Sequence, residues 1–156
     1  MPDPEPAGET LFAETCRVTP DASGVEAIHA ALDRAWRAMD DALACPPDPL
    51  WRMLFATAAG EIAANIITHA GAGTATLALC LRPDRLTAIF RDHGAPYVAP
   101  PDLEADDLDA PHEMDALSEH GRGIDLARAA LDTLTYTRTP PGENIWTLEK
   151  RFAPSP

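Results

Sequence analysis

The sequence predicts a two-layer α/β sandwich, in which a mixed, mostly antiparallel sheet carries helices on one face. Strand-like segments come in adjacent pairs joined by short turns, and helix-like segments lie between them. The chain has 156 residues, of which 46% are hydrophobic, and this suits one domain with a single core. We expect that domain over residues 10–153, after a disordered, Pro-rich and acidic tail at residues 1–9.

The first part of the chain predicts one strand and two helices. The strand covers Leu11 to Thr19. The first helix is capped by Asp21 or Ser23, shows an apolar stripe at helical spacing, and ends before Pro46. The second helix begins near Pro49 and ends at glycines 71 and 73. It is apolar on almost every side, which predicts a buried helix.

The second part predicts two hairpins separated by a long connection and a helix. The first hairpin pairs residues 74–81 with 86–91 around a Pro-containing turn. Residues 92–119 have no clear element, and a loop this long in a compact domain is usually functional or mobile. A helix opened by Gly121 and extending to Leu134 follows, and strands at 133–139 and 145–152 then flank a turn at 140–144.

The composition disfavours several classes of function. The net charge is −13, with 12 basic and 25 acidic residues, so direct nucleic-acid binding is not expected and a partner protein with a basic face is favoured. Three cysteines without metal-ligand spacing predict reduced thiols, and the simplest alternative is three small core residues. No leader sequence or membrane span is predicted, so we expect a cytoplasmic protein.

The buried second helix carries two polar residues on one side. Glu61 and Asn65 are four residues apart, so they project from the same face of the helix. Burial without partners would cost several kcal/mol, so these side chains need partners or a wet cavity. A satisfied buried Glu with a surface Asn is one interpretation. The other is a site in which Asn65 binds Mg²⁺ and Glu61 accepts a proton.

Asp92 and Gly94 follow the apolar strand of the first hairpin. Asp at a strand end commonly forms a turn, and this interpretation stays open. In the functional interpretation, Asp92 accepts the amino group of adenine and Gly94 lets the flat base approach the backbone.

Gly121, Arg122 and Gly123 precede the third predicted helix. Glycines at a helix N-terminus expose backbone N–H groups to an anion, and Arg122 could donate to a phosphate. Gly also simply begins helices, so this pattern alone has two interpretations.

The order of these three patterns resembles the GHKL (Bergerat) ATPase superfamily, with its N-box, G1 box, ATP lid at about residues 95–120, and G2 box. Within it, the chain resembles the anti-sigma-factor serine kinases. The stretches that carry this resemblance are residues 61–70, 91–97, 121–132 and 142–152. The resemblance covers the chain from about Leu11 to Phe152.

The resemblance implies ATP and Mg²⁺ as cofactors and assigns roles to single residues. Asn65 would bind Mg²⁺, Glu61 would be the catalytic base, and Asp92 would hold adenine beside Gly94. The residues implied at the phosphates are Gly121, Arg122 and Gly123. Thr147 matches a polar position near the adenine, although a Thr in a strand needs no such explanation.

The resemblance also implies an activity and partners. The family transfers the γ-phosphoryl group of ATP to a serine of a STAS-domain anti-anti-sigma protein and otherwise sequesters a sigma factor, often as a homodimer. A non-catalytic sequestering protein and a sandwich without ligand remain alternatives. The catalytic domain of a sensor histidine kinase is disfavoured, because only His29 precedes the N-box.

The chain departs from the family pattern at two places. Ala95 and Pro96 stand where the fuller pattern has a second glycine. Asp125, in the first turn of the phosphate-side helix, would oppose a triphosphate if it pointed inward. Residues 102–115 are strongly acidic, which predicts either a solvated lid or a face for a basic patch on a sigma factor.

Overall fold

The computed structural model describes residues 8–69, 71, 73–98 and 118–152, with only the backbone for residues 69 and 118–122. The predicted tail and the predicted lid therefore lie largely outside the described residues, and the acidic segment 102–115 lies wholly outside them.

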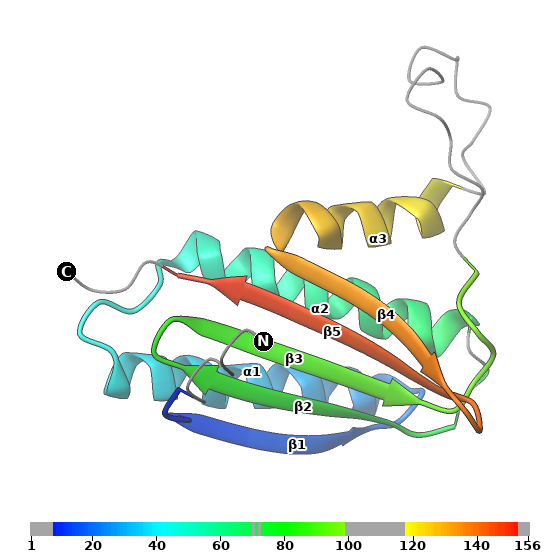
Figure 1. Cartoon of the computed structure of the whole chain (residues 1–156), viewed down its shortest axis with the longest axis horizontal. Helices are drawn as coiled ribbons and strands as arrows, with labels where there is room; N and C mark the ends of the chain where they lie inside the picture. The colour runs from blue at the N-terminus through cyan, green and yellow to red at the C-terminus, as the bar shows by residue number, and fades with distance from the viewer. Residues whose placement is uncertain (1–7, 70, 72, 99–117, 153–156) are drawn as a thin grey trace, which may run out of the picture.

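Five strands form one sheet in the spatial order β1-β2-β3-β5-β4 (Figure 1). Their bounds are Phe12–Val18 for β1, Ala75–Arg82 for β2, Arg85–Asp92 for β3, Thr133–Thr139 for β4 and Glu143–Arg151 for β5. All four pairings between neighbouring strands are antiparallel. The parallel pairs that a mixed sheet implies are thus not found in the part of the chain that the structure describes.

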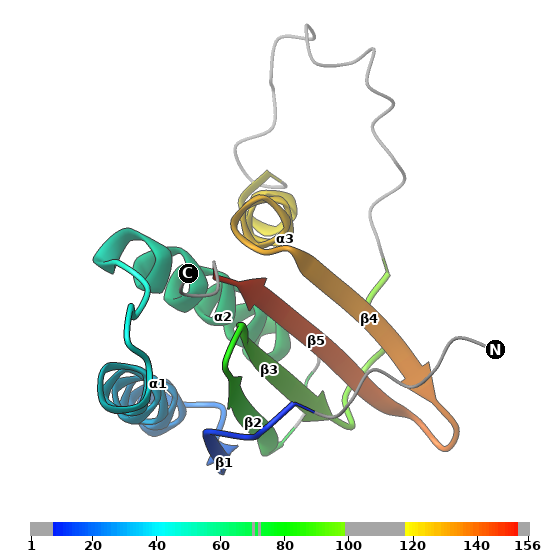
Figure 2. The same ribbon diagram turned by 60° about the vertical axis from the view of Figure 1, so that its left-hand side comes forward.

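Within the described residues, three helices cover one face of this sheet (Figure 2). They are α1 at Ala22–Ala42, α2 at Pro49–His69 and α3 at Ser118–Ala130. The core lies between the two layers, and it contains alternate residues of β2, such as Leu77 and Leu79, together with buried side chains of α2, such as Phe55 and Ile62. The predicted two-layer α/β sandwich is confirmed.

Local sequence explains where the first two helices begin. The side chain of Asp21 accepts a hydrogen bond from Gly24 N at 3.3 Å, and the carboxylate of Asp48 accepts one from Trp51 N at 2.8 Å. Each bond satisfies a backbone donor that the first turn of a helix leaves free. No helix in the described ranges is long and apolar enough to cross a membrane.

The last helix and the last strand have bounds that differ from the prediction. Helix α3 begins at Ser118, three residues before Gly121, and it ends at Ala130, so Leu134 lies on β4. Strand β5 begins at Glu143, so Asn144 belongs to the sheet and not to the turn. The physical reason is Gly142, whose φ of +118° completes the turn one residue before the strand.

Two aromatic clusters mark the opposite ends of β5. Trp51 of α2 donates from Nε1 to Arg151 O at 2.8 Å, and its ring meets Phe152 at a centroid distance of 5.6 Å. At the other end, Trp146 packs against Tyr97 and Tyr136, with ring centroids 5.0 and 4.7 Å away. The first cluster closes the core, and the second lines a cavity.

Candidate functional site

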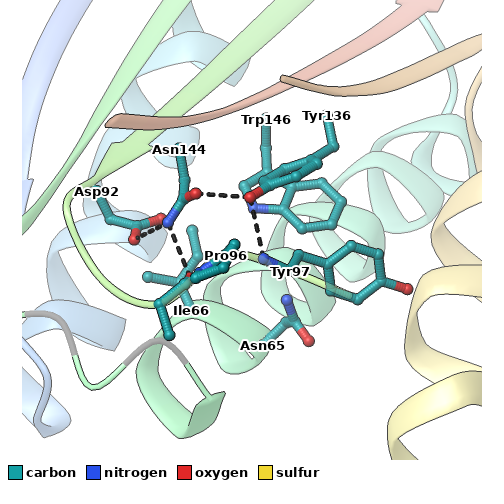
Figure 3. Close-up of a pocket in the computed structure, with 9 residues that line it drawn as sticks. Asn65, Ile66, Asp92, Pro96, Tyr97, Tyr136, Asn144 and Trp146 are labelled. Atoms are coloured by element: carbon teal, nitrogen blue, oxygen red, sulfur yellow. Dashed lines mark hydrogen bonds between the residues drawn. The ribbon is translucent and has the colours of Figure 1, made fainter. Parts of the chain in front are cut away.

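A small cavity lies where the end of β3 meets the start of β5, beside the second half of α2 (Figure 3). Its volume is about 30 Å³, enough for about two water molecules and much less than a purine ring needs. The residues that line it are Asn65, Ile66, Asp92, Ala95, Pro96, Tyr97, Tyr136, Asn144 and Trp146. Two predicted site residues, Asn65 and Asp92, are therefore brought together at one cavity.

Asp92 is the last residue of β3 and is only 1% exposed. Its Oδ1 accepts hydrogen bonds from Gly94 N at 2.9 Å and from Asn144 Nδ2 at 2.8 Å. Among the described residues, its Oδ2 has no hydrogen-bond partner. A buried carboxylate with one oxygen left over is suited to accept an N–H group of a ligand in the cavity.

Gly94 lies in the turn after β3, as predicted, and takes part in this arrangement with both its backbone groups. Its N–H donates to Asp92, and its carbonyl accepts from Arg138 Nη1 at 3.0 Å and from Asn144 Nδ2 at 3.2 Å. The turn is therefore tied to the neighbouring strands. The turn-forming and ligand-binding interpretations of Asp92 are compatible, because they use different oxygens.

Asn144 of β5 was not predicted as a site residue, yet it is buried at 2% exposure and paired in register with Asp92. Its Oδ1 accepts from Tyr136 Oη at 2.6 Å (Figure 3) and from Arg138 Nη1 at 2.7 Å. A strand beginning at Glu143 alternates Asn144, Trp146 and Leu148 on one face. This alternation is the sequence signal from which Asn144 could have been assigned to the site.

Tyr97 fills the space beside α2. Its backbone N–H donates to Tyr136 Oη at 3.0 Å, and its ring packs beside Trp146 with the hydroxyl pointing toward α3 (Figure 3). Burial raises the pKa of the Tyr97 phenol, nearby Arg128 lowers it, and Asp125 raises it. The ring therefore extends toward α3 and forms one wall of the cavity.

Glu61 and Asn65 both lie on α2 and are half-buried. In the described part of the chain, neither side chain has a hydrogen-bond or ion-pair partner. Glu61 contacts α3, since a Cβ built on Gly123 would overlap Glu61 Oε2 and lie 3.4 Å from its Cδ. Gly123 is thus required for close packing of α3 against the Glu61 carboxylate.

The predicted phosphate residues lie in α3, but not ahead of it. Gly121 and Gly123 fall inside the helix, where backbone N–H groups bond to carbonyls of the preceding turn. The expectation that these glycines precede a helix N-terminus is therefore wrong for this conformation, because the helix begins at Ser118. Gly123 instead lies where α3 packs against Glu61. The side chain of Arg122 lies outside the described residues.

Thr147 is not brought to the cavity. It pairs with Ile89 of β3 and Thr135 of β4, and the alternation of β5 puts it on the opposite face from Trp146. The predicted role near a base therefore has no geometric support, and the polar group of β5 at the cavity is Asn144.

Asn65 is the side chain that fits a magnesium ion. No group of three or more His, Cys, Asp or Glu side chains is arranged to hold a metal among the described residues. Mg²⁺ in phosphotransfer sites often takes only one or two protein ligands, because substrate phosphates and water supply the others. An unpartnered amide oxygen at the cavity is compatible with that kind of site.

Comparisons with known proteins agree with this geometry. Residues 23–148 match the family model of the histidine kinase-like ATPase domain, which spans all the residues of the cavity. No curated protein matches the chain. The family model covers most of the sequence, and the antiparallel sheet with helices on one side agrees with it. The chain therefore belongs to the histidine kinase-like ATPase domain family, whose members bind ATP.

Proposed function

We propose that this protein is a Mg²⁺-ATP-dependent serine kinase that acts as an anti-sigma factor and phosphorylates a serine of a STAS-domain anti-anti-sigma protein. The observation that carries the proposal is the pair Glu61 and Asn65. Both are half-buried on one side of α2, without partners in the described residues, next to the cavity that contains Asp92. A protein that only binds nucleotide has no need of a free carboxylate there.

Each residue has one role in the proposed reaction. Asp92 accepts the amino group of adenine, and Gly94 is the small residue beside the base. Asn65 binds Mg²⁺, which neutralises charge on the triphosphate when it is bound. The residues proposed for the phosphates are Gly121, Arg122 and Gly123. Because these N–H groups lie within α3 in this conformation, the proposal requires the start of α3 to rearrange when ATP binds.

Glu61 is the proposed general base. Phosphoryl transfer depends mainly on positioning and charge neutralisation, and a carboxylate aligns the attacking hydroxyl and accepts its proton. The phosphoryl group passes from ATP to the serine oxygen, ADP leaves, and the proton of the serine is held by Glu61.

A non-catalytic anti-sigma protein is the second candidate. It is favoured by the small cavity, which Tyr97 helps to line, and by Asp125, an exposed acid on α3 close to Tyr97. Replacement of the base separates the two candidates. In a kinase, Glu61→Gln should keep ATP affinity and abolish phosphotransfer. In a sequestering protein there is no phosphotransfer to lose, and Glu61→Gln should leave partner binding unchanged.

The proposed partners are a sigma factor and its STAS-domain antagonist. The net charge of −13 favours a basic partner face, and the acidic segment 102–115 is the proposed contact. Neutralising that segment should weaken the sigma-factor complex and reduce its salt dependence. Unchanged affinity at low salt would reject this contact.

The first experiment is a calorimetric titration with ATP, with and without Mg²⁺, of the wild type and Asp92→Asn. Mg²⁺-dependent binding that Asp92→Asn removes supports the assigned pocket. The kinase activity is then tested by phosphate-affinity electrophoresis of STAS-domain proteins from the same organism, incubated with the wild type or with Glu61→Gln. Binding of ATP without transfer to any of these proteins favours the sequestering protein.

A further inference from the structure

Asn144 is a buried amide whose orientation is fixed by its neighbours. Its Oδ1 meets Tyr136 Oη at 2.6 Å and Arg138 Nη1 at 2.7 Å. Guanidinium groups can only donate, and the Tyr136 oxygen already accepts from Tyr97 N at 3.0 Å. The side facing these two donors must be the oxygen, so the NH₂ group faces Asp92.

The NH₂ group of Asn144 holds both Asp92 and the turn that follows it. Nδ2 lies 2.8 Å from Asp92 Oδ1, 3.2 Å from Gly94 O and 3.1 Å from Ala95 O. A carboxylate that receives two donors on Oδ1 cannot rotate without breaking both bonds. Asp92 Oδ2 therefore remains the oxygen available to a ligand.

We propose that Asn144 is a positioning residue for nucleotide binding, which Arg138 and Tyr136 orient so that it holds Asp92 Oδ1 and leaves Oδ2 for the base. This inference rests on the proposed role of Asp92 as the acceptor for adenine. Asn144 does not touch the nucleotide in this scheme, because its amide is fully used within the protein.

The charged groups nearest to Asn144 come from several elements. From β4, Arg138 and Tyr136 contact Asn144 directly. On β5, Glu143 lies on the opposite face of the sheet, where it pairs with Arg91 and exposed His93. From the helices, Glu61 of α2 lies against α3, and Asp125 and Arg128 of α3 lie near Tyr97. Arg138 is thus the one cation at hydrogen-bonding distance within the described residues.

The substitution Asn144→Asp tests the proposal, because it changes NH₂ to oxygen and keeps the shape. At neutral pH and above, the new carboxylate would face Asp92 and two carbonyls without a proton between them. One pKa of two carboxylates that share a site is raised, so the pair takes up one proton as the pH falls, and that proton recreates the lost donor to Asp92. ATP affinity of this variant should therefore recover as the pH falls.

The measurement is the ratio of variant to wild-type Kd for ATP with Mg²⁺, from pH 5.5 to pH 8. Taking the ratio cancels the titration of ATP itself. We expect binding to be weaker by at least about tenfold at pH 8, and within about threefold of the wild type at pH 5.5. A second variant, Arg138→Met, should weaken binding about threefold to tenfold without this pH dependence, because it only frees the amide to turn. Arg17→Met, an exposed arginine on β1, is the matched control and should bind as the wild type does.

The outcomes separate this inference from the proposed function. Thermal unfolding at each pH identifies any variant that fails to fold. If Asn144→Asp does not fold, the proposal is tested with Arg138→Met, which changes an exposed residue. If the wild type binds ATP and Asn144→Asp or a folded Arg138→Met binds equally well at every pH, the role of Asn144 is rejected alone. If Asn144→Asp binds weakly at every pH although it is folded, the proton-sharing argument is rejected. If the folded wild type does not bind ATP, the proposed function and this role are rejected together.

Discussion

The contact between Gly123 and Glu61 predicts that Gly123→Ala separates stability from activity. A Cβ at position 123 would overlap Glu61 Oε2, whereas the next atoms, Glu61 Cδ and Cβ, are 3.4 and 3.8 Å away. The overlap therefore involves only the end of a flexible side chain, and no backbone atom has to move. We therefore expect α3 to tolerate Gly123→Ala, while the Glu61 carboxylate is displaced from its present position.

The two effects have different sizes. Replacing Gly by Ala inside a helix stabilises by roughly 0.5–1 kcal/mol, which raises the Tm of a domain of this size by about 1–4 °C. A displacement of a catalytic group by about 1 Å can cost on the order of 10²-fold in rate. We expect Gly123→Ala to be at least as stable as the wild type and to transfer phosphate about 10- to 100-fold more slowly.

Thermal unfolding, ATP titration and single-turnover phosphotransfer check this prediction. Gly60→Ala is the matched control, because Gly60 lies on α2 with nothing within 4 Å of a built Cβ. It should gain similar stability and keep full activity. Undiminished transfer by Gly123→Ala would refute the placement of Glu61 as the base. Loss of ATP affinity in Gly123→Ala would instead support a close approach of phosphates to Gly123.

Three further predictions concern Tyr97 and Asp125. Tyr97→Ala removes a ring from the wall of the small cavity, so ATP should bind several-fold more tightly, although loss of the aromatic contacts should lower the Tm. Equal or weaker ATP binding would show that the ring does not block the site. Burial raises the pKa of Tyr97, so the stability that its neutral phenol contributes is present below the unfolded value of about 10 and is lost as the pH rises above it. The Tm of Tyr97→Phe should fall less than that of the wild type between pH 9.5 and 11. Parallel curves of Tm against pH for the two proteins would reject this prediction. Asp125→Asn should tighten ATP binding about twofold to fivefold at low salt, with the difference shrinking in 0.5 M salt; no change at low salt would mean that Asp125 does not face the triphosphate.

Patterning along the chain was enough to predict the fold. Alternating apolar residues place β2 and β3 on the core, and the nearly all-apolar α2 is the buried helix that the composition predicted. The cap of α1 at Asp21 was one of two predicted residues. These features depend on local sequence periodicity and capping, which one sequence contains.

The site was predicted only in part, because half of it depends on the register between distant strands. Asn65 and Asp92 were found from motif spacing. Asn144 was assigned to a turn, and its pairing with Asp92 across 52 residues follows from where β5 begins, a boundary that propensity does not determine. Thr147 was selected by family resemblance alone, and the alternation of β5 faces it away from the cavity.

The pairing of Asp92 with Asn144 also has a consequence for the newly made chain. The two halves of the hydrogen-bonded site enter the ribosomal exit tunnel 52 residues apart, and the strand that completes it is inserted between β3 and β4. Domains fold as units while synthesis proceeds from the N-terminus. If Asp92 holds the nucleotide as proposed, a nascent chain that already displays Asp92 lacks the partner that fixes its carboxylate until β5 has emerged and joined the sheet. On the proposed role of Asp92, ATP would stabilise the completed domain more than any intermediate that lacks β5.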